Sequence, residues 1–164
     1  MADRSKLVLA LAILVVLLSG CLKSEEFPNE PRIEFLSFER TGDSAVVTIS
    51  FTDGDGDIGL AEGDTFPPYD EPPYDKNLYL EYEEFEEGAW VPVQLGVSSL
   101  IGYRIPVITP TGQNKTLEGE IAIRLQPFVL FHQPDADTIR YGIRLFDRAL
   151  NESNKVYTGT ILVP

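Results

Sequence analysis

Three aspartates at alternate positions are the residues of this sequence whose spacing best suits a chemical role. Asp53, Asp55 and Asp57 are separated by single glycines in the stretch Thr-Asp-Gly-Asp-Gly-Asp-Ile-Gly, residues 52–59. Carboxylate oxygens are hard ligands, and several of them suit Ca²⁺ better than Mg²⁺, which prefers a strict octahedron with several retained waters. Glycine permits the positive-φ turns that curl a loop round an ion. The spacing therefore predicts a calcium site in residues 53–59, which we call the acidic loop.

The acidic loop resembles the first half of an EF-hand calcium loop, in which positions 1, 3 and 5 supply side-chain ligands. The resemblance is partial, because position 6 is Ile58, the glycine is displaced to Gly59, and position 12 is Asp64 instead of glutamate. No helical pattern flanks the loop, and Asp64 or Glu62 is the candidate that would complete the ligand shell. The alternative is a solvated acidic turn, since Asp-Gly is an ordinary turn dipeptide. Repulsion among three carboxylates favours the cation.

A sixth candidate for the site, Asp147, comes from a distant part of the chain. Alternation predicts strands over 45–51 and 138–146, and as the second and sixth strands of a sandwich both would run towards the same end. Asp147 follows the later strand and would then lie near the acidic loop. The alternative is that Asp147 begins the turn 147–154 and bonds nearby backbone, or pairs with Arg148, which is the commoner role of such an aspartate.

Period-two alternation of apolar and polar residues is the main structural signal after residue 31. It predicts an all-β domain, because no window there shows a helical stripe. About seven short strands separated by Gly, Pro, Asn and Asp turns indicate an antiparallel sandwich of immunoglobulin or fibronectin type III architecture. A single cysteine means that the Cys-Trp-Cys pattern of true immunoglobulin domains is absent. The predicted strands are 33–38, 45–51, 77–83, 89–93, 103–108, 117–125, 138–146 and 156–163.

The first 20 residues have the pattern of a signal peptide. Arg4 and Lys6 precede an apolar run over residues 7–18, which is shorter than the roughly 20 residues that span a bilayer. The run leads into Leu-Ser-Gly-Cys at residues 18–21, which resembles the lipobox of bacterial lipoproteins. The resemblance implies that Cys21 is lipidated and becomes the mature N-terminus, anchored by several acyl chains. The alternative is an ordinary cleaved signal followed by an incidental cysteine.

Residues 21–31 are polar, contain two prolines and show no periodicity, so they are predicted to be a flexible tether that precedes the domain at 32–164. Leu22 lacks the aspartate that favours inner-membrane retention in many Gram-negative lipoproteins. Lys23 followed by Glu25 and Glu26 resembles the acidic export signal of surface lipoproteins in Bacteroidetes. These two features predict attachment to the outer membrane with exposure at the cell surface. The stretch Phe-Thr-Asp-Gly-Asp-Gly-Asp-Ile-Gly at residues 51–59 and the closing turn Asp-Arg-Ala-Leu-Asn-Glu-Ser-Asn at residues 147–154 resemble uncharacterised Bacteroidetes lipoproteins. That resemblance supports the lipoprotein and sandwich predictions and transfers no activity.

Composition excludes several classes of protein. The 164 residues include 13 Lys and Arg against 26 Asp and Glu, a net charge of −13, which would repel nucleic acid and anionic headgroups. One cysteine and one histidine exclude a disulfide framework, a cysteine zinc site and a histidine-rich metal site. Catalysis by His132 lacks a Gly-x-Ser-x-Gly elbow, and carboxylate pairs are too abundant to indicate a glycosidase. The sequence therefore predicts a protein that is not an enzyme.

Two copies of Pro-Pro-Tyr-Asp, at residues 67–70 and 72–75, favour an exposed polyproline II loop. Tyr69 and Tyr74, with Trp90, are candidate contacts for a glycan or protein partner. The alternatives are an insertion that folds over the acidic loop, and a tryptophan that packs among cross-strand aromatics. Residues 53–87 hold 13 acidic residues and one basic residue, so this flank would attract cations and basic partners.

Three functions are consistent with these features. The first is a non-catalytic, membrane-anchored Ig-like scaffold at the outer membrane surface or in the periplasm, stabilised by Ca²⁺. The second is a carbohydrate- or protein-binding component of an outer-membrane uptake or adhesion system. The third is a hydrolase, which would need a concave pocket holding two carboxylates, or His132 with Ser and Asp.

Overall fold

Nine β-strands form in the computed structural model, which describes residues 27–96, 98–112, 115–130 and 137–163. The predicted signal peptide at residues 1–20, Cys21 and His132 lie outside these described residues. Within them there is no helix, and hence none long and apolar enough to cross a membrane. The strands are β1 (Arg32–Thr41), β2 (Ser44–Asp53), β3 (Leu78–Glu86), β4 (Ala89–Pro92), β5 (Leu100–Tyr103), β6 (Leu117–Leu125), β7 (Thr138–Leu145), β8 (Val156–Tyr157) and β9 (Ile161–Leu162).

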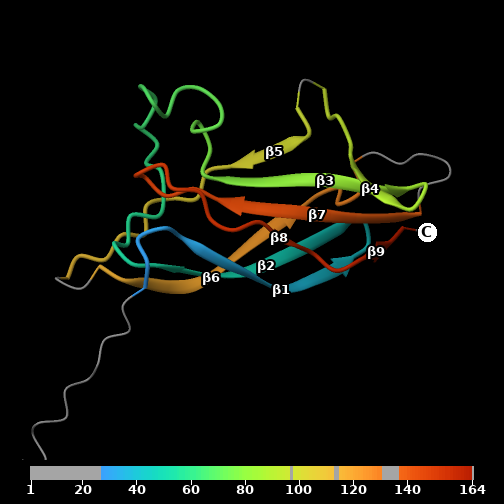
Figure 1. Ribbon diagram of the computed structural model, residues 1–164, viewed down its shortest axis with the longest axis horizontal. Helices are drawn as coiled ribbons and strands as arrows, with labels where there is room; N and C mark the ends of the chain where they lie inside the picture. Colours follow the sequence, from blue (N-terminus) through green and yellow to red (C-terminus); the bar gives the residue numbers. More distant parts are fainter. Residues whose placement is uncertain (1–26, 97, 113–114, 131–136, 164) are drawn as a thin grey trace, which may run out of the picture.

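The strands make two antiparallel sheets packed face to face (Figure 1). One sheet has the order β1-β2-β6, and the other has the order β4-β3-β7-β8, with β5 also paired to β3 and β9 to β7. The chain crosses from one sheet to the other three times, between β2 and β3, between β5 and β6, and between β6 and β7. The predicted all-β sandwich of immunoglobulin or fibronectin type is confirmed at the level of fold class.

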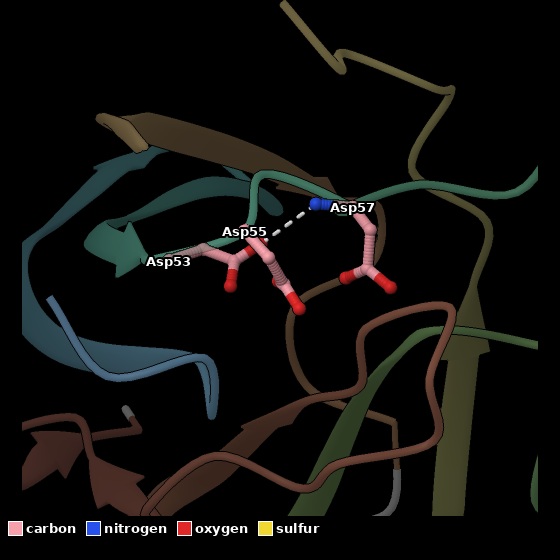
Figure 2. Close-up of side chains that lie close together, drawn as sticks. All are labelled: Asp53, Asp55 and Asp57. Atoms are coloured by element: carbon pink, nitrogen blue, oxygen red, sulfur yellow. Dashed lines mark hydrogen bonds between the residues drawn. The ribbon is translucent and has the colours of Figure 1, made fainter. Parts of the chain in front are cut away.

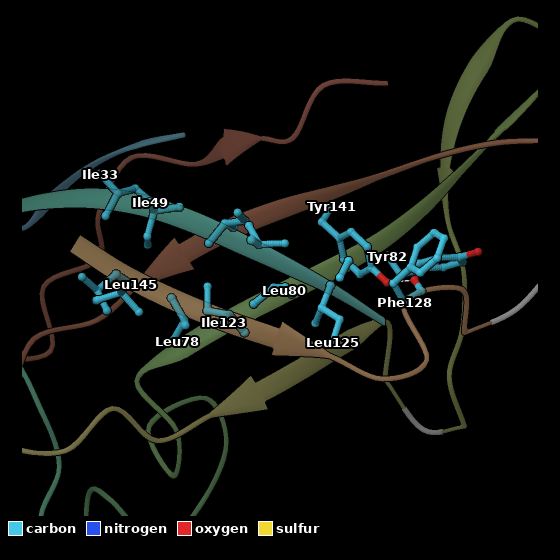
Figure 3. Packing of buried hydrophobic residues seen from close by; sticks show 14 of the residues in the cluster. Ile33, Ile49, Leu78, Leu80, Tyr82, Ile123, Leu125, Phe128, Tyr141 and Leu145 are labelled. Atoms are coloured by element: carbon cyan, nitrogen blue, oxygen red, sulfur yellow. Dashed lines mark hydrogen bonds between the residues drawn. The ribbon is translucent and has the colours of Figure 1, made fainter. Parts of the chain in front are cut away.

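The core lies between the two sheets and follows the alternation of the sequence. In β2 the buried apolar residues are Ala45, Val47, Ile49 and Phe51, and the residues between them face outwards. Figure 3 shows side chains of both sheets meeting in this layer. Complete burial of one such aliphatic side chain contributes about 1.5–3 kcal/mol. The fully buried members from the second sheet are Leu78, Leu80, Tyr82, Ile139, Tyr141, Ile143 and Leu145.

The structure corrects two strand predictions. The strand predicted at 103–108 lies instead at Leu100–Tyr103, and the residues after it are irregular. Pro106 has no N–H for a ladder, and its neighbours bond elsewhere: Leu60 N donates to Ile105 O at 2.9 Å and Ile108 N to Ile58 O at 3.2 Å. The strand predicted at 156–163 is divided into β8 and β9. The division of the last strand turns the eight predicted ranges into nine strands.

The end of the predicted tether contacts the domain. Pro31 is buried, and the carbonyl of Pro28 accepts a hydrogen bond from Gly54 N at 2.8 Å. Phe27 is half-buried, whereas residues 28–30 are exposed. Residues 27–31 therefore run along the domain next to the acidic loop.

Replacing Tyr141 by Phe is expected to reduce the free energy of unfolding by about 1–2 kcal/mol. Tyr141 is fully buried, and its hydroxyl donates to the carbonyl of Phe128, which would be left without that donor. Urea unfolding measures the loss, with Tyr157→Phe as the control because Tyr157 is 38% exposed. Equal effects of the two substitutions would show that the buried hydrogen bond contributes nothing.

Candidate metal centre

Two aspartates lie at the ends of strands from different sheets, each in the alternating phase that faces the core. Along β2 every second residue is buried, and this phase ends on Asp53, which is 0% exposed. Along β7 the same phase passes through Leu145 and reaches Asp147, which is 2% exposed. Both strands run towards the same end of the sandwich, where Ile58 and Asp147 form an isolated β-bridge. Strand order and phase together place two carboxylates between the sheets at this end.

The acidic loop turns its three carboxylates towards one another (Figure 2). One ligand oxygen from each of Asp53, Asp55 and Asp57 lies within 4.8 Å of the others. Asp57 N donates to Asp53 Oδ2 at 3.0 Å, which closes the loop on itself. The Oδ1 atoms of all three residues are buried and have no hydrogen-bond partner in the described part of the chain. Buried acceptors without partners are costly, and an oxygen-liganded cation is the group that would satisfy all three at once.

The electrostatics of the cluster are those of a site that lacks positive charge. The pKa of Asp53 is raised to about 7, mainly by burial and then by repulsion from the neighbouring Asp55 and Asp57 carboxylates. Burial is also the main cause of the raised pKa of Asp57, followed by repulsion from Asp147. The pKa of Asp147 is raised for the same first reason. A divalent cation would favour the charged form of all these groups.

Asp147 lies next to the acidic loop, as predicted from strand order, and it also organises its own turn. Its Oδ1 and Oδ2 accept hydrogen bonds from the backbone N and side-chain Nδ2 of Asn151, both at 2.7 Å. The same turn reaches the acidic loop, because Arg148 N donates to Asp57 O at 3.2 Å and Ala149 N to Asp57 Oδ2 at 3.0 Å. The two interpretations of Asp147 are therefore compatible, although Arg148 pairs with a different aspartate.

That aspartate is Asp64, which lies outside the group of three carboxylates. Its Oδ2 accepts from Ala61 N at 2.8 Å and from the guanidinium of Arg148. This pairing lowers the pKa of Asp64, with the Arg148 hydrogen bond as the largest cause. Glu62, the other candidate for completing the ligand shell, is exposed. The geometry thus gives Asp64 a partner of its own away from the cluster, whereas Asp147 lies beside the acidic loop through its bridge to Ile58.

Three glycines of the acidic loop are required by close approach of other backbone segments. A Cβ on Gly54 would lie 2.2 Å from Phe27 O, and one on Gly56 would lie 1.8 Å from Lys115 O. A Cβ on Gly59 would lie 2.3 Å from Pro106 O. Gly56 and Gly59 also have positive φ angles, of 66° and 116°. The predicted role of glycine in curling the loop holds for these two, and the enclosure of the loop by three segments adds a second reason.

The tyrosines of the Pro-Pro-Tyr-Asp repeats pack onto the turn after β7. Tyr69 donates its hydroxyl hydrogen bond to Arg148 O at 2.7 Å, and the Arg148 guanidinium carbon lies 5.4 Å from the centre of its ring. Tyr74 packs edge-on against Phe146, with ring centroids 5.8 Å apart. The repeats therefore fold over this end of the domain, as the alternative interpretation of the loop expected.

Trp90 lies far from the two tyrosines. It pairs with Phe85 near the end of β3, whereas Tyr74 precedes the start of that strand at Leu78. Seven residues of strand separate the two places by about 23 Å. The face of its indole is covered by Arg140, whose guanidinium carbon is 4.4 Å from the ring centre. The three candidate ligand-binding aromatics do not form one surface.

Two arginines hold the long connection between β2 and β3: Arg148, which the sequence suggested as a partner of Asp147, and Arg104, which it did not single out. Arg104 donates to the carbonyls of Ala61 at 2.7 Å, Asp75 at 2.9 Å and Asp64 at 3.2 Å. Arg148 contributes the ion pair with Asp64 described above. The signal in the sequence was the strongly acidic segment 53–87, because a basic residue near so many carboxylates is readily drawn towards them.

No family model matches this chain, and neither a curated protein nor a solved structure matches it. The case for a cation site therefore rests on the geometry of the described residues and on the chemistry of their side chains.

Asp64→Asn is expected to leave the calcium affinity within a few-fold of the unsubstituted protein, whereas Asp55→Asn is expected to abolish measurable binding. The first carboxylate is bound to Ala61 and Arg148, and the second has a buried oxygen without a partner among the described residues. Isothermal titration calorimetry of both variants makes the comparison. A loss of binding in Asp64→Asn equal to that in Asp55→Asn would place Asp64 in the ligand shell.

Proposed function

We propose that this chain is a non-catalytic, lipid-anchored module of a bacterial outer membrane, and that its Ig-like domain binds Ca²⁺ at the acidic loop. The observation that supports cation binding most directly is Asp53. This residue is completely buried, has an oxygen without a partner among the described residues, and faces two half-buried aspartates that each have such an oxygen as well. A buried charge in that position is stable only when it is paired or bound to a metal.

The proposed ligands are Asp53, Asp55, Asp57 and Asp147, with the Gly59 segment enclosing the loop. The cation would supply positive charge to a cluster whose members raise one another's pKa values. Because Asp53 ends β2 and Asp147 follows β7, the ligands come from both sheets. A shared ion would therefore stabilise this end of the sandwich as a cross-link between the sheets.

A calorimetric titration of the full chain in detergent tests cation binding. We expect one binding event for Ca²⁺, with a Kd of about 10⁻⁴–10⁻³ M as in extracellular calcium modules, and weaker binding of Mg²⁺. Asp55→Asn is the variant that should lose the heat of binding. No heat with either ion in the unsubstituted chain would contradict the proposed site.

The proposed anchor is supported by the Leu-Ser-Gly-Cys stretch at residues 18–21 and by the apolar run before it. Metabolic labelling with a radioactive fatty acid tests it. The unsubstituted chain is expected to carry label and to sediment with membranes, and Cys21→Ala to lose both. A chain that remains labelled after Cys21→Ala would carry its lipid elsewhere.

The proposal of a scaffold instead of a hydrolase is supported by the way the acidic side chains are used. Glu83 pairs with Arg140 at 2.5 Å, and Glu81 with Lys155. Asp64 pairs with Arg148. These carboxylates are engaged in holding strands and loops in place, which is the role expected of a structural module.

A further inference from the structure

The N-terminal segment of the domain, residues 27–30, contacts a glycine of the acidic loop. Gly54 N donates a 2.8 Å hydrogen bond to Pro28 O. The position of a Cβ on Gly54 is taken by this segment, with Phe27 O at 2.2 Å and Pro28 O at 2.7 Å. Gly54 is not one of the glycines with a positive φ angle, so its backbone conformation does not require glycine. The glycine at this position is therefore explained by the approach of Phe27 and Pro28.

The segment depends on this contact for its position. Residues 28–30 are exposed, and the segment is fixed again only where Pro31 is buried and β1 begins. A cavity of about 440 Å³ lies beside Phe27 and Pro28, over the outer face of the three-stranded sheet, and is lined there by Glu34, Thr52 and Glu120 among others. The segment is thus loosely packed on that side, and the hydrogen bond at Gly54 is what holds Pro28 to the domain.

The contact lies inside the proposed cation site. Gly54 stands between Asp53 and Asp55, whose Oδ1 atoms are buried and have no partner in the described part of the chain. Without a cation, the Asp53 and Asp55 carboxylates repel each other, which favours rotation of the peptide units on either side of Gly54. A bound ion would fix both carboxylates and, with them, the direction of the Gly54 N–H. The Gly54 carbonyl is held separately, by Thr116 Oγ1 at 3.3 Å.

We propose that the cation-loaded acidic loop is the docking site for Phe27 and Pro28, so that cation binding sets the point at which the membrane tether leaves the domain. This inference rests on the proposed cation site. With the ion bound, the tether ends at Phe27. With the ion removed, residues 27–30 join it and lengthen its reach by up to about 14 Å. The ion thereby controls how closely an anchored domain is held to its membrane.

The test uses the full chain in detergent, with Phe27→Trp in a Trp90→Phe background, so that one indole reports the position of the segment. Acrylamide quenching of its fluorescence is measured in EDTA and in saturating Ca²⁺. We expect calcium to reduce the quenching. Gly54→Ala is expected to abolish this response, because the methyl group would overlap two backbone oxygens. The calcium-induced change in melting temperature is measured in the same variant.

Gly63→Ala is the matched control. Gly63 lies in the same connection between β2 and β3, and a Cβ there would meet nothing within 4 Å, so this variant should keep both responses. In the chain without substitutions, nuclear magnetic resonance should show slower hydrogen exchange of the Gly54 amide when Ca²⁺ is added.

The outcomes separate the two proposals. Quenching and Gly54 exchange that do not respond to calcium, in a protein whose melting temperature does respond, would overturn the docking proposal and leave the cation site intact. The same response in Gly54→Ala as in Gly63→Ala would also overturn docking. A protein in which calcium changes neither the melting temperature nor the heat of titration would overturn the proposed site itself.

Discussion

Calcium at about 100 times its Kd is expected to stabilise the domain by about 2.7 kcal/mol. In a protein of this size that corresponds to a rise in melting temperature of about 5–10 °C. The reason is that the ion binds only where Asp53, Asp55 and Asp57 are brought together, which happens in the folded state. A thermal melt followed by circular dichroism, in EDTA and then with added Ca²⁺ or Mg²⁺, measures the shift.

Asp55→Ala is the variant that should lose this shift, and Asp70→Ala is its matched control. Asp70 is an exposed aspartate of the connection between β2 and β3 and lies outside the three-carboxylate group. A saturable shift in Asp70→Ala but not in Asp55→Ala would assign the stabilisation to the acidic loop. If neither ion moves the melt of the unsubstituted protein, the loop is a solvated turn.

Without calcium, the domain is expected to lose stability as the pH rises from about 4 to 7. The pKa of Asp53 is 3.8 when unperturbed and about 7 in the folded protein, so over this range the folded state binds the proton more tightly. Raising the pH ionises the unfolded chain first and favours unfolding, by at most about 4 kcal/mol for this group. The raised pKa values of Asp57 and Asp147 act in the same direction.

Below pH 4 the domain is expected to lose stability as the pH falls. Asp64 and Glu81 have lowered pKa values through Arg148 and Lys155, so their ion pairs stabilise the fold above their unfolded pKa and are lost on acidification. The cation-free protein should therefore be most stable near pH 4, where the two trends meet. Urea unfolding at pH 5 and pH 8 in a chelator measures the slope.

Asp53→Asn is expected to flatten the pH dependence between 5 and 8, because it removes the group with the highest pKa of the cluster. Saturating calcium should flatten it as well, since the ion replaces the proton as the source of positive charge. A steep decline that persists in Asp53→Asn would assign the dependence to other groups.

Much of the fold could be predicted because it depends on local pattern. The alternation around Val47 and Ile49, and again around Ile143, fixes which face of a strand is buried, whatever its partner. Where a tertiary contact competes with the pattern, the prediction failed. Ile105 is apolar and stands in an alternating stretch, yet its backbone binds Asn77 and Leu60, with Asn77 Oδ1 accepting from Ile105 N at 2.6 Å, and no strand forms there.

The sequence by itself determined the three carboxylates of the acidic loop and their nearness to one another, because residues two apart in a glycine-rich loop cannot lie far apart. It also predicted, from an assumed strand order, that strands 45–51 and 138–146 point to one end and bring Asp147 near the loop. Tertiary structure alone decided that Asp64 pairs with Arg148, 84 residues away. It alone decided that Phe27 and Pro28 occupy the space above Gly54. Both contacts join segments whose separation depends on how the two sheets pack, which no local spacing records.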